Sequence, residues 1–204
     1  MEEVIRMVLE EKTLPLATMG GMLVILLFCI FTLASAAQYP VAFSPMDNWL
    51  SDLGTALKNP AGDIYFNVGS ILGGIALLLT VIGLGIWKDG KNDGLLLAGR
   101  ACGAICALGL MLIGVFHEGT SYHSIIAFTF FVMLALFLAL TSAALWKNPA
   151  YGRWLGYYSI LVIILDIWFV VTFIIYEHAP IWEWIAVLSG LLWVALLAYQ
   201  TLRL

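Results

Sequence analysis

The chain has 204 residues, of which 63% are hydrophobic and only 11% are charged, with a formal net charge of −4 and a mean hydropathy of +1.01. An ordinary soluble domain has roughly a quarter of its residues charged, and it avoids exposing apolar surface on the scale required here. Three cysteines exclude a disulfide scaffold, and the acidic balance excludes nucleic acid as a partner. The composition therefore predicts an all-α, multi-pass integral membrane protein, located in the cell membrane.

Six stretches are apolar and long enough to cross a hydrocarbon core of about 30 Å, which takes about 20 helical residues. They cover residues 14–37, 64–87, 95–116, 122–146, 154–176 and 181–202. The residues before them, 1–13, place apolar and charged side chains on different helix faces, a pattern typical of an interfacial helix. We therefore expect a single membrane domain over residues 1–204, built as a polytopic bundle of six transmembrane helices.

The cationic residues lie almost entirely at one end of this expected bundle. Of the nine Lys and Arg residues, only Lys58 falls on the side opposite the N-terminus. Because cytoplasmic loops carry an excess of Lys and Arg, both termini are predicted to be cytoplasmic (N-in and C-in).

The connection between the first two spans, about residues 38–63, is the only predicted outer segment that exceeds a turn. Ser44 followed by Pro45 is typical of a capped helix start, and Gly54 is typical of a helix end. The intervening Trp and Leu residues give this segment an apolar face. We therefore expect a short amphipathic helix over 44–54, lying on the outer mouth of the bundle as a candidate lid.

Polar side chains in the second span follow a helical spacing. Asp63, Asn67 and Ser70 are offset by four and three residues, which places them on one helix face running inward from the outer end. We therefore expect this polar face of the second span to line one side of an outward-facing pocket.

The fifth span contains a deep carboxyl group. Ser159, Asp166 and Glu177 share one face, and Asp166 lies about 15 Å below the outer end of its helix. A carboxyl group at that depth is costly unless it is neutral, paired or hydrated, so it is a candidate functional group. The alternative is a protonated structural Asp bonded to a neighbouring helix.

All three histidines lie in or beside the predicted outer connections. Together with one carboxylate they could bind a divalent metal such as zinc, with one coordination position open for water. The candidate ligands are His117, Glu118, His123 and His178. Their spacing matches no zinc signature.

Three motifs occur in the order DNWLSDLG, NPAGDIYFNVGSILGG and GVFHEGTSYHSIIAFTFF. In this order the chain resembles the family of six-helix membrane proteins known only as domain of unknown function 998, and more distantly the Frag1/DRAM-type membrane proteins. The first resemblance covers nearly the whole chain, and it implies a six-helix fold without an established activity. It places six residues at the motif positions of the family: Asn48, Ser51, Asp52, Asn59, Asn67 and His123.

The sequence leaves three functions open. The first is binding or transport of a small solute or lipid headgroup in an outward-facing polar pocket, with Asp166 as an intramembrane protonatable group. The second is a non-enzymatic scaffold or sensor subunit, and the third is a metal-dependent membrane hydrolase. Membrane lipids are the expected surroundings in every case. The candidate pocket residues are Asn48, Ser51, Asp52, Asp63, Asn67, Ser70, His123, Ser159, Asp166 and Glu177.

Overall fold

The computed structural model describes residues 14–176 and 178–204, so the predicted interfacial helix over 1–13 and Glu177 lie outside the described residues. Six helices are long and apolar enough to cross a membrane, and the described residues form no strand. They are α2 (Leu16–Ala37), α3 (Asp63–Gly83), α4 (Asp93–Val115), α5 (His123–Leu145), α6 (Arg153–Tyr176) and α7 (Pro180–Leu202). A short 3-10 helix, η2 (Leu84–Trp87), extends α3. The predicted all-α bundle with six candidate spans is confirmed.

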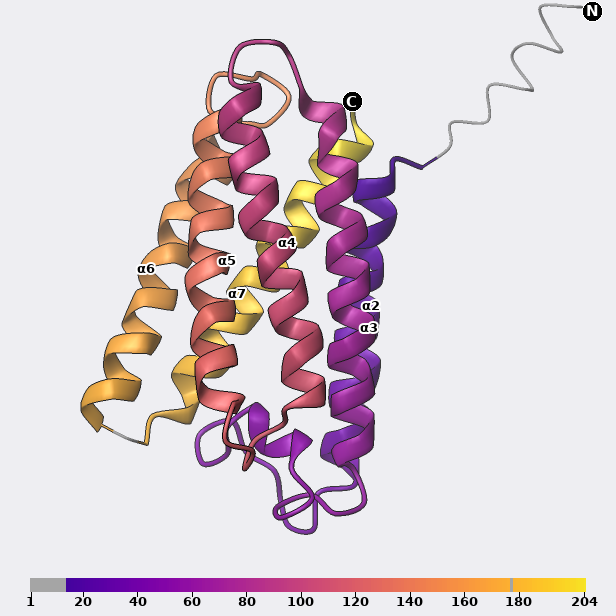
Figure 1. Ribbon diagram of the computed structural model, residues 1–204, viewed down its shortest axis with the longest axis vertical. Helices are drawn as coiled ribbons and strands as arrows, with labels where there is room; N and C mark the ends of the chain where they lie inside the picture. Colours follow the sequence, from indigo (N-terminus) through magenta and orange to yellow (C-terminus); the bar gives the residue numbers. More distant parts are fainter. Residues whose placement is uncertain (1–13, 177) are drawn as a thin grey trace, which may run out of the picture.

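The six helices form a closed ring (Figure 1). Each helix packs against the next one in the sequence, and α7 crosses obliquely behind α4 and α5 and returns to α2. We call the end that carries residues 38–62 the loop end, and the end that carries the C-terminus the terminal end. Which side of a membrane each end faces stays a prediction from the distribution of charge.

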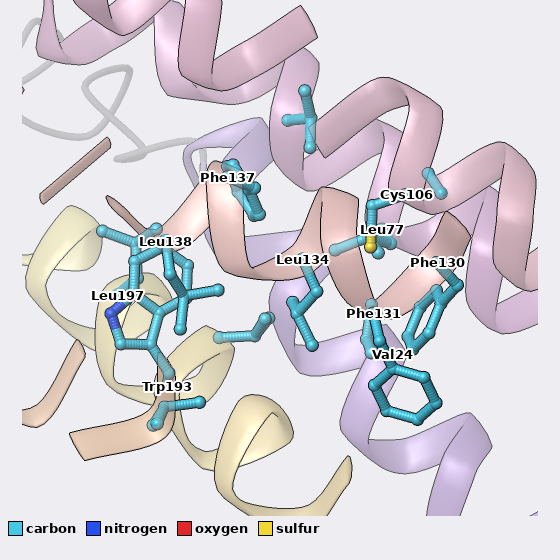
Figure 2. Packing of buried hydrophobic residues seen from close by; sticks show 14 of the residues in the cluster. Val24, Leu77, Cys106, Phe130, Phe131, Leu134, Phe137, Leu138, Trp193 and Leu197 are labelled. Carbon is cyan, nitrogen blue, oxygen red and sulfur yellow. The ribbon is translucent and has the colours of Figure 1, made fainter. Parts of the chain in front are cut away.

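The middle of the core is supplied by α5, whose large apolar side chains recur every three or four residues and therefore lie on one side of the helix. Figure 2 shows Leu134 and Phe137 on this side, next to Trp193 of α7 and Cys106 of α4. Phe137 and Trp193 are fully buried, and their ring centroids lie 5.4 Å apart with the rings edge to face. This aromatic pair thus joins α5 and α7 just past the middle of the bundle, toward the terminal end.

Glycines allow close contact between neighbouring helices. A Cβ added to Gly74 of α3 would lie 2.7 Å from the carbonyl oxygen of Ala107 in α4, and one added to Gly99 of α4 would lie 2.7 Å from Oγ1 of Thr141 in α5. Real Cβ atoms do not come so close to other atoms, so only glycine fits at these crossings. Close approach of this kind is a common way of associating helices in membranes.

The long connection at the loop end is less helical than expected. The predicted helix over 44–54 is a turn followed by a single 3-10 turn, η1 (Ser51–Gly54). A polar side chain bonds to the backbone at the start of each turn. Oδ1 of Asn48 accepts a hydrogen bond from the Ser44 amide, and Oδ2 of Asp52 accepts one from the Trp49 amide. These bonds favour two separate turns over one continuous helix.

Two buried asparagines hold this connection onto the bundle. Nδ2 of Asn59 donates to the carbonyl oxygens of Ser35 in α2 and of Leu53 in η1, at 3.2 and 3.1 Å. Nδ2 of Asn67 in α3 donates to the carbonyl oxygen of Gly54 at 2.9 Å. The asparagines therefore fix η1 against the ends of α2 and α3.

Candidate functional site

Two hollows meet at the loop end of the bundle. The vestibule, of about 230 Å³, lies between α5 and α6 beside the segment that enters η1. The chamber, of about 110 Å³, lies among α2, α3, α4, α5 and α7. Ser51, His123 and Glu183 line both hollows, so the two adjoin at these polar side chains.

The lining of the vestibule has an aromatic part and a polar part. The rings of Trp49 and Phe173 lie 5.7 Å apart between centroids, and those of Phe131 and Phe169 lie 4.7 Å apart. The ionisable side chains of the lining are His123, Glu118 and Glu183. Such a combination suits a ligand that has both an apolar and a polar part.

A lysine joins two carboxyl groups next to the vestibule. Nζ of Lys58 lies 2.6 Å from Oδ1 of Asp52 and 3.0 Å from Oε1 of Glu118. The Asp52 side chain is buried, whereas that of Lys58 is 43% exposed. The second carboxyl oxygen of Glu118, Oε2, is buried and has no hydrogen-bond partner among the described residues.

The pKa of Glu118 is raised from its ordinary 4.5 to about 7. Burial is the largest cause, the neighbouring Asp52 adds to the rise, and Lys58 partly opposes it. Burial lowers the pKa of Lys58, but its bonds to Asp52 and Glu118 outweigh burial and leave that pKa above its usual value. The lysine is therefore charged at neutral pH, while Glu118 gains and loses its proton in that range.

The first turn of α7 supplies another carboxyl group and a second anchor for the connection. Oε2 of Glu183 accepts a hydrogen bond from the Leu50 amide at 2.6 Å, and Nε1 of Trp184 donates to the carbonyl oxygen of Asn48 at 3.0 Å. Glu183 thus both positions η1 and faces the two hollows.

The three histidines have separate surroundings. Nδ1 of His123 lies 3.0 Å from the carbonyl oxygen of Phe116, which can only accept a hydrogen bond, so Nδ1 carries the proton in the neutral ring and Nε2 is the acceptor. Nδ1 of His117 bonds in the same way to the carbonyl oxygen of Glu118 at 2.9 Å. His178 is exposed, and its ring packs edge to face on Trp49 at 6.0 Å between centroids.

The predicted metal ligands do not converge. Within residues 14–176 and 178–204, no group of three or more His, Cys, Asp or Glu side chains is arranged to hold a metal ion. His117 and His123 each use one ring nitrogen on the backbone, and His178 lies on the ring of Trp49. The expected zinc site of His117, Glu118, His123 and His178 is therefore not formed, and the metal-dependent hydrolase loses its basis.

The residues of the predicted polar face of the second span each have a different hydrogen-bond partner. Oδ1 of Asp63 accepts a hydrogen bond from the amide of the next residue, Ile64, at 2.8 Å, and Asp63 lines neither hollow. Asn67 holds η1, whereas Ser70 lines the chamber while its hydroxyl bonds to the Phe66 carbonyl one turn earlier.

The polar residues of the fifth span are separated as well. Ser159 lies in the terminal half, where its hydroxyl bonds to Ser142 and Trp193. Asp166 is 3% exposed, lines neither hollow, and its Oδ1 has no hydrogen-bond partner among the described residues. Among the predicted pocket residues, Ser51 and His123 line both hollows, and Asp52 lies beside them through Lys58.

Sequence reasoning missed Glu183, Lys58 and the aromatic part of the lining as members of the site. Lys58 was identified only as the exception to the distribution of positive charge. A single cation amid many carboxylates was nevertheless a usable signal for an ion pair. Glu183 carried no comparable signal, because its contact with Leu50 joins residues 133 positions apart.

Comparisons with known proteins agree with this architecture. A family model described as "Protein of unknown function (DUF998)" matches residues 22–200. No curated protein matches the chain, and no solved structure matches it. The likeness to Frag1/DRAM-type proteins stays an expectation from the sequence. Because the matched region covers most of the chain, this six-helix membrane-type protein belongs to the DUF998 family.

Proposed function

We propose that the protein binds a small ligand with a cationic head, either a small organic amine or an amine-bearing lipid headgroup, in the vestibule between α5 and α6. The observation that carries the proposal is a hollow of about 230 Å³ with aromatic rings and two carboxyl groups in its lining. Ligand sites in proteins are commonly apolar hollows with a few polar groups that orient the ligand.

The charge at this end favours a cation. Asp52, Glu118 and Glu183 supply three carboxyl groups, while Lys58 is the cation bonded to two of them. An ammonium group would donate charge-assisted hydrogen bonds to the carboxylates, which are the stronger kind. It would also be attracted to the face of the Trp49 ring. An anionic head would meet the same groups with repulsion.

The ligand enters from the side of the bundle in this proposal. The lining of the vestibule includes Phe128, Phe173 and Ile174, which are 52%, 47% and 69% exposed on the apolar flanks of α5 and α6. Figure 1 shows α5 and α6 separated at the loop end and closer together at the terminal end. A ligand dissolved in the membrane would therefore reach the carboxyl groups between these two helices.

Asp166 is the protonatable group of the proposal. It lies one helical turn from Phe169 and Val170, which line the vestibule, although Asp166 itself lines neither hollow. A buried carboxyl group without a partner takes up a proton more readily than an exposed one. We expect Asp166→Asn to remove part of the pH response of ligand binding, measured in nanodiscs between pH 5 and pH 8, without abolishing binding.

The first test compares three probes of similar shape, namely benzylamine, benzyl alcohol and benzoate, by calorimetric titration of the full chain in nanodiscs. Benzylamine is expected to bind most tightly. Glu118→Gln and Glu183→Gln should each weaken it by about tenfold, since each removes one charge-assisted interaction. Asp63→Asn is the matched control, because this carboxyl group lies at the same end outside both hollows. Equal affinity for the amine and the alcohol contradicts the proposal.

The second test fills the vestibule. Val170 lines it from α6, whereas the next residue, Val171, is 39% exposed and lines neither hollow. Val170→Trp should abolish benzylamine binding, and Val171→Trp should leave it unchanged. Equal loss of binding in both variants would show that the vestibule is not the site.

A further inference from the structure

The chamber extends the vestibule into the middle of the bundle. At its deep end it is lined by aliphatic side chains from α2, α3, α5 and α7, namely Val24, Leu77, Leu134 and Val194. Figure 2 shows Val24, Leu77 and Leu134 grouped around the centre of the bundle near Phe130 and Phe131, which also line the chamber. Apolar cavities of this kind stay dry and accept apolar molecules.

The chamber is long and narrow. Its lining in α7 runs from Glu183 to Val194, which corresponds to about 16 Å along a helix. A volume of about 110 Å³ over such a length makes the chamber too narrow for two hydrocarbon chains side by side.

Glycines create this space in a bundle that is otherwise tightly packed. A Cβ added to Gly73 would meet only Cδ2 of Leu110 at 3.7 Å, and one added to Gly190 would meet only Cδ2 of Leu134 at 3.3 Å. The neighbouring Gly74, by contrast, lies against the backbone of α4. Gly73 is therefore not required for helix contact, and at Gly190 only the end of the Leu134 side chain would have to shift, so the missing side chains of both glycines leave the chamber open.

We infer that the protein takes up a single-chain amphiphile whose alkyl chain lies in the chamber and whose cationic head lies in the vestibule. This inference rests on the proposed function, which it deepens by adding the class of ligand. The two hollows adjoin at Ser51, His123 and Glu183, which places the polar groups at the position where the head of such a molecule would join its chain.

The membrane side of the vestibule fits the same ligand. Its exposed apolar flank lets an amphiphile leave the lipid with the head entering first, after which the chain follows into the chamber. Because the chain exchanges lipid for an apolar protein interior, the gain comes from close packing rather than from release of water. The fit of the chamber should therefore select chain number and length, while the carboxyl groups select the head.

The test is photolabelling of the full chain in phosphatidylcholine nanodiscs with dodecylamine that carries a diazirine on its terminal carbon. The expected result is saturable labelling of peptides from the deep end of the chamber, competed by unlabelled dodecylamine. Dodecanoate with the same diazirine should label these peptides at least about tenfold less, because its head repels the carboxylates. Equal labelling by the two probes contradicts the cationic head.

Filling the chamber separates this inference from the proposed function. Gly73→Leu should remove the deep labelling and leave benzylamine binding intact, and Gly73→Ala should reduce the labelling less. Gly94→Leu is the matched control, because a Cβ there meets no atom within 4 Å and Gly94 lies outside the chamber. Unchanged deep labelling in Gly73→Leu overturns only the site for the alkyl chain. Failure of the unaltered protein to bind benzylamine overturns the proposed function.

Discussion

One cluster of buried polar side chains in each half of the bundle allows a comparison, because the two clusters are hydrogen-bonded to different extents. In the terminal half, the hydroxyl of Ser159 lies 2.6 Å from Oγ of Ser142 and 2.6 Å from Nε1 of Trp193, and Tyr151 bonds to the same two serines. This cluster joins α5, α6 and α7, and it lines neither hollow. A polar network whose members are all bonded makes the packing of helices more specific.

In the loop half, the polar groups are less completely bonded. Glu118 has a buried oxygen without a partner among the described residues, and it lines the vestibule. A buried polar atom without a partner costs free energy, so its presence beside a hollow indicates a task other than stability. The fully bonded cluster around Ser159 thus holds helices together. The incompletely bonded cluster beside the vestibule is where a ligand would contribute the missing contacts.

The largest expected effect distinguishes the two kinds of glycine. Gly83 of α3 lies against the backbone of Ala17 in α2, where a Cβ could fit only if the helices moved apart. Gly83→Ala should therefore lower the free energy of unfolding by about 3 kcal/mol, whereas Gly73→Ala should change it by less than about 0.5 kcal/mol. Unfolding in mixed micelles measures both. Similar losses in the two variants would mean that the loop half is as tightly packed as the terminal half.

A smaller effect is expected at the centre of the bonded cluster. Ser159→Ala leaves Nε1 of Trp193 without its acceptor and should cost about 1–2 kcal/mol of unfolding free energy. The control is Ser189→Ala, whose hydroxyl bonds only within its own helix. Benzylamine affinity should not change in either variant. A weaker affinity in Ser159→Ala would show that the two halves are coupled rather than separate.

The spans were predictable because the cost of burying charge in a membrane leaves long uncharged stretches in the sequence. The same reasoning located His123 at the start of a helix beside the site. Helical spacing also placed Asp63, Asn67 and Ser70 on one side of α3, but it could not show that each residue has a different partner. Helical periodicity predicts which residues share a helix face, but it does not predict which residues that face contacts.

The site itself depends on contacts between distant parts of the chain. Lys58 reaches Glu118 across 60 positions, and Leu50 reaches Glu183 across 133. The chamber is lined by Gly73 and Gly190, which face only the ends of leucine side chains, and in the sequence these glycines look the same as glycines that hold helices together. Residue types and spacing alone could therefore indicate an ion pair at Lys58, but they could predict neither its partners nor the chamber.

The smallest expected effect concerns pH. The folded state holds the proton of Glu118 more tightly than the unfolded state, because burial raises its pKa from 4.5 to about 7. The stability contributed by this proton is therefore complete below about pH 4.5 and is lost as the pH rises through about 7. Glu118→Gln, which keeps an acceptor for Lys58 but cannot ionise, should flatten the fall in melting temperature between pH 5 and pH 7.5 by about 2–4 °C.

The control for this pH effect is Asp63→Asn, which removes a carboxyl group from the same end but outside the network. Its melting temperature should follow the unaltered chain across the whole range. If Glu118→Gln also followed the unaltered chain, Glu118 would be ionised throughout and fully paired with Lys58. Because Lys58 can neutralise only one of the two carboxylates bonded to it, the cluster of Asp52, Glu118 and Lys58 would then carry excess negative charge across the whole range, which would favour a cationic ligand at every pH tested.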